Sequence, residues 1–494
     1  MNKIKQYNTN NLQAVKCGLF LIFIFSSLLT FSYNIKVEIK NCPEYYIYFG
    51  KHRGPDFTVI DSVQAVNGLV EFSGKKNLET GVYFIVIPPQ TRFDFIIADE
   101  QNFTLKTDTR NILGELISNG EKQYQIFLDI QKDIAEINKK RSQLEMESEF
   151  YKMYQKDTIP YITAKIDSLN QIQFDIYETY KTKLDKSTFV YDILSILSPF
   201  HVPDSIAKLQ YEEPAIHYRY YIDHYLDRIN FDNPSILNTP EFVFHKLLAD
   251  YCYYFFDVRA NKLDDAYHDM DNLIAKTENK PEFRQYILSY LVSRYEKPQD
   301  LRLESFLVYL YRNYFMINRP DWVTDQAFDI MKLRIESVQY NLVGSIGKNL
   351  VLNNQNGDSV SIYGLESNYK VLFFWEPSCD ICTDAILKLK EEYSDLEAHN
   401  VQVFAVCTNS NEINDWKSFI NDKQLNWINA IDIRNSSNFK IYYGTYKTPR
   451  LFILDSNNKI LTKDVKPDYV YEYIKSYEEH LEKERGRFDF MFGE

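Results

Sequence analysis

Residues 373–382 read FFWEPSCDIC, and here a strongly apolar segment meets two closely spaced cysteines. The preceding residues, KVLFFW at 370–375, form the short apolar run expected of a buried strand. The residues that follow, 378–396, carry apolar side chains every three or four positions, which indicates an amphipathic helix. Cys379 and Cys382 are therefore predicted to lie where a buried strand passes into a helix.

A cysteine at the start of a helix is well placed to act as a nucleophile. Unpaired backbone N–H groups and the helix dipole favour the thiolate there, and the thiolate is the reactive form in disulfide exchange. Cys379 would hold that position. Cys382 follows one helical turn later, close enough to attack a mixed disulfide formed by the first sulfur. We therefore predict that Cys379 attacks and Cys382 resolves.

The sequence leaves other uses of this pair open. A zinc site needs a second pair of ligands, and neither Cys407 with His399 nor His217 with His224 has the required spacing, so no metal is predicted. A structural disulfide is a second alternative, although a bond between positions this close removes little entropy from the unfolded chain. A third is a redox-inactive domain that happens to keep two cysteines.

Strands and helices alternate on both sides of the pair, over residues 345–485. Asn356-Gly357 between two alternating runs predicts a hairpin before it. After it we expect a strand at 401–409, a helix at 413–422, strands at 451–456 and 458–462, and a helix at 468–484. This order is typical of an α/β layer fold, followed by a tail at 486–494.

Thr448-Pro449 stands directly before the strand expected at 451–456. Proline removes a backbone donor and is tolerated only at the start or edge of a strand. A cis peptide at this place would turn the chain toward another loop, so Thr448 and Pro449 are a second mark of a functional site.

Two further domains are predicted upstream. Residues 34–118 contain short alternating runs, broken at pairs such as Asn67-Gly68 and Pro88-Pro89, which indicates a β-sandwich-like domain. Residues 119–340 change to helical periodicity, with prolines mostly where helices would start or stop, which indicates an all-α domain. The fold class is therefore multidomain, in agreement with a length of 494 residues and a typical domain size of about 150.

The first 33 residues read as an export signal. Basic residues without any acid precede the apolar run GLFLIFIFSSLLTF at 18–31. This run is short for a membrane span of about 20 residues, so a cleaved signal peptide is favoured over an uncleaved anchor that would tether the chain to a membrane. The predicted location is the periplasm or cell envelope.

Composition excludes some partners. The net charge of −13 repels phosphate backbones, so no nucleic-acid partner is expected. The chain has 6 cysteines, which are too few for a disulfide framework in an exported protein. The one close pair is therefore conspicuous.

Residues 346–484 resemble the thioredoxin superfamily, and more closely its TlpA-like, AhpC/TSA-related branch of exported bacterial thiol-disulfide oxidoreductases. The resemblance rests on Trp375, Cys379, Cys382, Thr448 and Pro449. It implies that the cysteines cycle between dithiol and disulfide, and it implies no cofactor. Three residues would serve substrate binding: Pro449 as a cis-proline facing the thiols, Thr448 through backbone hydrogen bonds, and Trp375 by packing beside the active site.

The upstream regions are similar to modules of unknown function that accompany thioredoxin-like domains in bacterial envelope proteins. The resemblance covers a β-rich module at about 35–125 and a helical module, marked mainly by residues 224–242. It implies an architecture and no activity. The partners it implies for the whole chain are envelope proteins with thiols or disulfides and an upstream membrane electron donor.

The residues around the pair differ from the family pattern. Phe373 and Ala385 stand where thioredoxins and some TlpA-like members carry an acid. Asp380 lies between the cysteines and Glu376 lies nearby, and carboxylates disfavour a neighbouring thiolate. A less stabilised thiolate means a less stable reduced form, so we predict a reductase rather than an oxidant.

Three other functions compete with a reductase. A disulfide isomerase would share the same residues. A peroxidase would carry threonine three residues before the reactive cysteine, and Glu376 occupies that place. The alternative from another class is a binding or scaffold protein of the envelope with a redox-inactive thioredoxin-like domain.

Overall fold

The computed structural model of the chain describes residues 32–492 except 90, 155–158, 201 and 210–212. The apolar run at 18–31 lies outside the described residues. The chain forms two compact units, Met1–His52 with Phe57–Ile176, and Arg53–Asp56 with Tyr177–Glu494. None of the helices in the described parts of the chain is long and apolar enough to cross a membrane.

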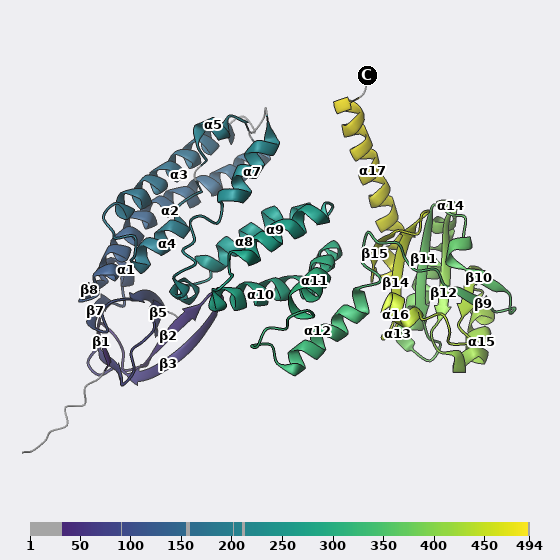
Figure 1. Cartoon of the computed structure of the whole chain (residues 1–494), viewed down its shortest axis with the longest axis horizontal. Helices are drawn as coiled ribbons and strands as arrows, with labels where there is room; N and C mark the ends of the chain where they lie inside the picture. Colours follow the sequence, from purple (N-terminus) through teal and green to yellow (C-terminus); the bar gives the residue numbers. More distant parts are fainter. Residues whose placement is uncertain (1–31, 90, 155–158, 201, 210–212, 493–494) are drawn as a thin grey trace, which may run out of the picture. The chain divides into compact units, whose positions relative to one another are not determined.

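The first unit contains the predicted β-rich region, drawn at the purple end of the colour scale in Figure 1. Its strands form two four-stranded sheets with the orders β4-β1-β7-β8 and β3-β2-β5-β6. The bounds are β1 Tyr33–Lys40, β2 Tyr46–Arg53, β3 Asp56–Gln64, β4 Leu69–Gly74, β5 Gly81–Ile87, β6 Thr91–Ile97, β7 Asn102–Asp108 and β8 Ile117–Asn119. The predicted β-rich fold of this region is confirmed.

Aromatic side chains fill the interior of these sheets. The Phe49 ring lies 5.2 Å from Phe72, 5.5 Å from Tyr83 and 6.1 Å from Phe95, measured between centroids. Burying rings of this size supplies much of the hydrophobic stabilisation of such a domain. The short helix α1 Ile112–Glu115 lies between β7 and β8 in the chain, and the helices α2 Lys122–Tyr154 and α3 Ile159–Lys181 follow β8.

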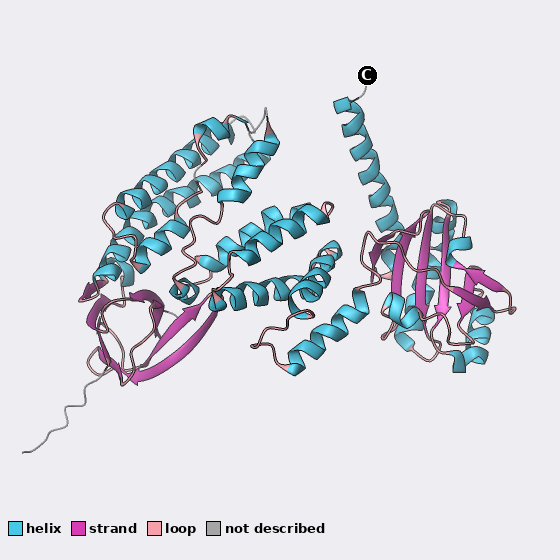
Figure 2. Cartoon of the chain, in the orientation of Figure 1, coloured by secondary structure: helices cyan, strands magenta, loops and turns pink. Residues whose placement is uncertain are grey.

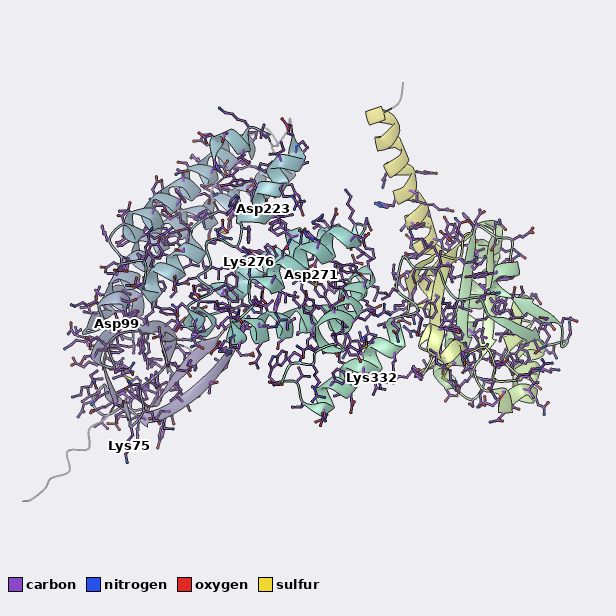
Figure 3. All side chains as sticks on the ribbon, in the orientation of Figure 1. Lys75, Asp99, Asp223, Asp271, Lys276 and Lys332 are labelled. Atoms are coloured by element: carbon purple, nitrogen blue, oxygen red, sulfur yellow. A yellow bond between two sulfur atoms is a disulfide. The ribbon has the colours of Figure 1, made fainter. Side chains whose placement is uncertain are left out.

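The second unit begins with helices, as predicted. They are α4 Phe189–Leu197, α5 Asp204–Ala207, α7 Pro214–His224, η2 Pro234–Asn238, α8 Phe244–Phe255, η3 Asp257–Arg259, α9 Leu263–Ala275, α10 Pro281–Glu296, η4 Leu301–Leu303, α11 Glu304–Leu310, the π-helix η5 Tyr311–Phe315 and α12 Asp325–Val338. Pro214 and Pro281 each open a helix, where the missing N–H costs nothing. Asp271, labelled in Figure 3, accepts hydrogen bonds from the hydroxyls of Tyr309 and Tyr314 and so ties α9 to the π-helix region.

The C-terminal part of this unit is an α/β domain around a seven-stranded sheet of order β10-β9-β13-β12-β11-β14-β15, visible as magenta arrows in Figure 2. Strands β11, β12 and β13 are parallel to one another, and the others pair antiparallel. The strands are β9 Val351–Asn354, β10 Ser359–Ser361, β11 Tyr369–Trp375, β12 Val401–Cys407, β13 Ile428–Ile431, β14 Arg450–Asp455 and β15 Ile460–Lys463. The helices are η6 Ile362–Gly364, α13 Asp380–Glu391, α14 Tyr393–Ala398, η7 Ser410–Glu412, α15 Ile413–Lys423, α16 Phe439–Tyr443, η8 Pro467–Tyr469 and α17 Val470–Phe492.

The central strand β11 is buried along its whole length, as its apolar sequence predicts. Val371, Phe373 and Trp375 face a core shared with α13, α15 and α17. Leu372 and Phe374 face the opposite core, which α16 completes. Helices thus cover both faces of the sheet, which explains why β11 shows no alternation of apolar and polar residues.

Most of the predicted elements of this domain are present. The hairpin at Asn356-Gly357 joins β9 to β10, and Gly357 has a φ of +94°, which glycine adopts without strain. The predicted helix at 378–396 is divided into α13 and α14. The short strand β13 and the short helix α16 were not predicted, because neither is long enough to show a clear period.

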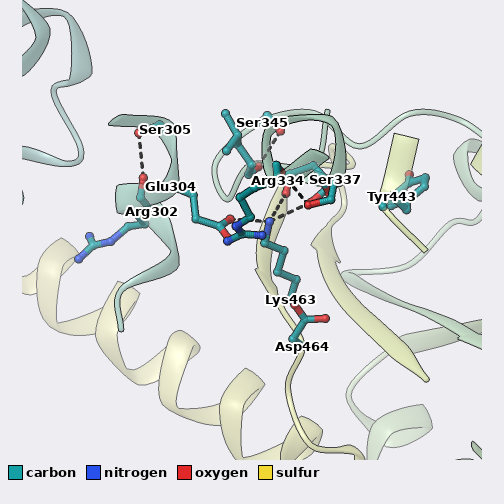
Figure 4. A network of polar contacts seen from close by, with 12 residues as sticks. Arg302, Glu304, Ser305, Arg334, Ser337, Ser345, Tyr443, Lys463 and Asp464 are labelled. Atoms are coloured by element: carbon teal, nitrogen blue, oxygen red, sulfur yellow. Dashed lines mark hydrogen bonds and ion pairs between the residues drawn. The ribbon is translucent and has the colours of Figure 1, made fainter. Parts of the chain in front are cut away.

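A buried ionic network joins the helices of the second unit to the edge strand β15 (Figure 4). Lys463 has a side chain that is 0% exposed, and its Nζ lies 2.6 Å from Glu304 Oε2 at the start of α11. Lys463 Nζ also donates to the carbonyl and side-chain oxygens of Asn341, at 3.1 and 2.9 Å. Arg334 of α12 donates to Glu304 Oε1 at 2.5 Å. A buried lysine is tolerated here because a carboxylate lies beside its charge and Asn341 accepts two of its N–H groups.

Candidate active site at the start of α13

The structure joins Cys379 and Cys382 in a disulfide with 5.1 Å between their Cα atoms. Cys379 is the N-cap of α13, and its Sγ accepts a hydrogen bond from the Cys382 backbone N–H at 3.2 Å. Cys382 is fully buried, whereas Cys379 is partly exposed. The two sulfurs therefore differ in access to solvent, and an external sulfur can approach Cys379 more readily than Cys382.

The neighbouring parallel strand β12 supports the turn that carries these cysteines. Thr408, directly after β12, donates its backbone N–H to the Trp375 carbonyl at 3.0 Å and its hydroxyl to Glu376 Oε1 at 2.5 Å. Further along, the Glu412 carboxylate accepts two hydrogen bonds from Ser378. Because β11 and β12 run parallel, the residues after both strands meet at the same edge of the sheet.

Trp375 is fully buried and packs against Phe419 of α15, with 5.2 Å between the ring centroids. It belongs to the same apolar core as Cys382. The indole therefore lies in the interior together with Cys382. The role of Trp375 in substrate binding stays a prediction.

Thr448 and Pro449 lie in the loop between α16 and β14, and the peptide bond between them is cis. Arg450 closes this loop, since its Nη1 donates to the carbonyl oxygens of Tyr443 and Gly444 at 2.7 and 2.8 Å. Both Thr448 and Pro449 are partly exposed. The part of these two residues in substrate binding stays a prediction.

Gly444 lets α12 approach this loop closely. Its φ is +60°, and a Cβ at this position would lie 2.1 Å from the Ser337 carbonyl oxygen of α12. The Asn341 amide donates to the carbonyls of Ser337 and Tyr442, at 2.9 and 3.1 Å. The helices before the α/β domain are thus in backbone contact with one end of the Thr448–Pro449 loop.

A third thiol, Cys407, lies at the end of β12, opposite Trp375 in the sheet register. Burial raises the pKa of the Cys407 thiol to about 12, and the negative charges of Glu412 and Glu376 act in the same direction. Its Sγ–H donates to the Asn409 carbonyl at 3.4 Å. Burial likewise raises the pKa of Cys252 in α8. Both thiols are therefore packed as apolar groups and are poor nucleophiles near neutral pH.

We expect the reduced, native protein to be alkylated by iodoacetamide at Cys379 and not at Cys407. At pH 8 a thiol with a pKa of about 12 is ionised in only about one molecule in ten thousand. Peptide mass analysis after a short exposure would measure labelling at each cysteine. Labelling of Cys407 at the rate of Cys379 would contradict this prediction, and labelling of all cysteines in denaturant is the control.

Sequence reasoning did not identify Thr408 and Glu412 as part of this site. A usable signal existed, because both lie at or just after the carboxyl end of the strand predicted at 401–409, and site residues of α/β sheets gather at that end of the strands. Phe373 and Ala385, which replace the family's acids, are both buried and apolar. Glu376 and Glu412 are carboxylates that the structure places beside the turn.

Within the described ranges, no group of three His, Cys, Asp or Glu residues is arranged to hold a metal ion.

Comparisons with known proteins match two parts of the chain. The model of the AhpC/TSA family matches residues 343–463, and that of a domain of unknown function, DUF4369, matches residues 33–127. No curated protein matches the chain.

Several solved structures are similar to parts of the chain. One is a domain of a possible thiol-disulfide isomerase from Cytophaga hutchinsonii, with 30% identity over 29% of this chain and 97% of that domain, and a TM-score of 0.28. Another is a thioredoxin-like protein from Bacteroides caccae, with 20% identity over 56% of this chain and 96% of that protein, and a TM-score of 0.39. A third is a thiol:disulfide interchange protein from Bacteroides sp., with 21% identity over 27% and 89%, and a TM-score of 0.26.

Proposed function

Because this chain belongs to the thioredoxin-like thiol-disulfide oxidoreductases with an AhpC/TSA-family domain, we propose that it is an exported reductase of disulfides in envelope proteins. The observation that carries this proposal is the difference in solvent exposure between the two cysteines at the start of α13. Cys379 is a partly exposed N-cap, and Cys382 is fully buried behind it. This arrangement presents one sulfur to a substrate and keeps the other within reach of the first.

The reaction would proceed in two exchanges. In the first, the Cys379 thiolate attacks one sulfur of a substrate disulfide, a mixed disulfide forms, and the other substrate sulfur leaves as a thiolate. In the second, Cys382 loses its proton and attacks Cys379, which releases the second substrate thiolate and forms the Cys379–Cys382 disulfide. Two electrons and two protons pass to the substrate. A dithiol protein donor, supplied through the membrane, would return the pair to the reduced state.

The charges around the turn support the reductive direction. Asp380 is the first residue of α13, Glu376 lies three residues before Cys379, and the Glu412 carboxylate is bonded to Ser378. Each negative charge opposes the helix dipole and disfavours a thiolate at Cys379. A reduced form that is poorly stabilised gives up electrons readily. The apolar run at 18–31 supports export to the envelope, with cleavage or with retention as a tether.

The reduction potential of the purified chain tests this proposal. The protein is equilibrated against thiol buffers of graded potential and quenched with a thiol label, and the labelled cysteines are assigned by mass. We expect a two-electron couple between Cys379 and Cys382 near the value of thioredoxin, about −270 mV. A value near −120 mV, like that of DsbA, would make the pair an oxidant and overturn the direction. If the two cysteines showed no reversible couple at all, the scaffold alternative would stand instead.

A further inference from the structure

Glu412 is hydrogen-bonded to Ser378, the residue directly before Cys379 in the sequence, although the two lie 34 positions apart in the chain. Its Oε1 accepts a hydrogen bond from Ser378 Oγ at 2.7 Å, and its Oε2 accepts one from the Ser378 backbone N–H at 3.1 Å. Asn409 Nδ2 donates to Glu412 Oε1 at 2.6 Å. Three donors therefore fix this carboxylate in one orientation, and hydrogen bonds to a charged acceptor are stronger than neutral ones.

The same carboxylate keeps a negative charge at the turn. Glu412 is partly buried at the start of α15, so water screens its charge less than it would screen that of an exposed side chain. Within the domain, the charges of Glu412 and Glu376 add to the effect of burial in raising the pKa of Cys407. Ser378 is covalently adjacent to Cys379, so the charge lies on the same turn as the exposed sulfur.

We propose that Glu412 is a positioning residue that shifts the equilibrium between the disulfide and dithiol forms of the Cys379–Cys382 pair. It does so by holding a carboxylate against the turn through Ser378. This inference rests on the proposed function, because only a redox-active pair has an equilibrium between disulfide and dithiol that Glu412 could shift. Reduction adds two electrons and two protons to the disulfide and yields two thiols, and Cys379 is the one that ionises. A fixed negative charge beside that thiolate destabilises the reduced form and favours release of the electrons to a substrate disulfide.

The test compares Glu412→Gln with two variants that keep the charge, in the full chain. Glu412→Gln has nearly the same shape and removes the negative charge. We expect its equilibrium constant with a thiol buffer at pH 8 to shift about threefold to tenfold toward the reduced form, which corresponds to a potential about 15–30 mV higher. Glu412→Asp keeps the charge on a shorter side chain, and Ser378→Ala removes the hydroxyl hydrogen bond but leaves the bond from the backbone N–H of residue 378 that holds the carboxylate. Both are expected to stay within about twofold of the wild-type constant.

Each outcome decides one question. A shift in Glu412→Gln that is absent from Glu412→Asp supports control by charge, which a merely structural role would not produce. If Glu412→Gln stays within about twofold of wild type, or if Glu412→Asp or Ser378→Ala shifts as much as Glu412→Gln, the inference is wrong. A loss of the cooperative melting transition would show that Glu412→Gln does not fold, and Glu412→Ala would then serve as the neutral variant. If the wild-type pair shows no couple, the proposed function fails before Glu412 is tested.

Discussion

Cys379→Ser is expected to lower the rate at which the protein reduces a disulfide substrate such as insulin by about 10³-fold or more. A serine hydroxyl does not ionise near neutral pH, so the first exchange has no nucleophile. The buried Cys382 cannot take over this role, since it lies at 0% exposure behind the turn. The rate of insulin reduction in the presence of excess dithiothreitol, corrected for the reaction without protein, measures the loss.

Two further variants make this prediction specific. Cys382→Ser keeps the attacking thiol and lacks the resolving one, so we expect a mixed disulfide with the substrate to accumulate as a species that is visible on a non-reducing gel. Cys42→Ser removes a partly exposed thiol of the first unit and is expected to leave the rate unchanged. Full activity in Cys379→Ser would contradict the assigned roles, and so would a trapped adduct that forms in Cys379→Ser and not in Cys382→Ser.

Lys463→Met is expected to lower the free energy of unfolding of the second unit by about 3–5 kcal/mol, because removing one partner of a buried ion pair strands the other. Glu304 would keep only Arg334, and the two Asn341 oxygens would lose the donor that now satisfies them. Urea unfolding followed by tryptophan fluorescence measures this loss. The signal is specific, since all four tryptophans lie in the second unit: Trp322, Trp375, Trp416 and Trp427.

A matched control separates the missing charge from lost packing. Replacing Lys463, Glu304 and Arg334 together by apolar residues of similar volume removes every charge of the network at once. Such replacements of a buried triad are often neutral or stabilising, so we expect the triple variant to recover most of the loss seen in Lys463→Met. A single variant that costs less than about 1 kcal/mol would show that this network contributes little to the docking of the helices on β15.

The elements that carry the cysteines could be predicted because their signals are local. The apolar run of β11, the period of α13 and the position of Cys379 as its N-cap all depend on residues within one or two turns. The same holds for the hairpin at Asn356-Gly357, where the turn chemistry is contained in two residues. Where an element is short, as in β13 and α16, the local signal is too weak to separate it from a loop.

By itself, the sequence determined where the thiol pair lies, which sulfur opens the helix, and that a sheet of buried strands surrounds it. Only the tertiary structure decided which charged side chains lie near those sulfurs. Glu412 binds Ser378 from 34 positions away because two parallel strands end at the same edge of the sheet. Lys463 of β15 meets Glu304 of α11 because separate helices pack on that edge strand. Such pairings depend on register and packing between distant segments, which no local period encodes.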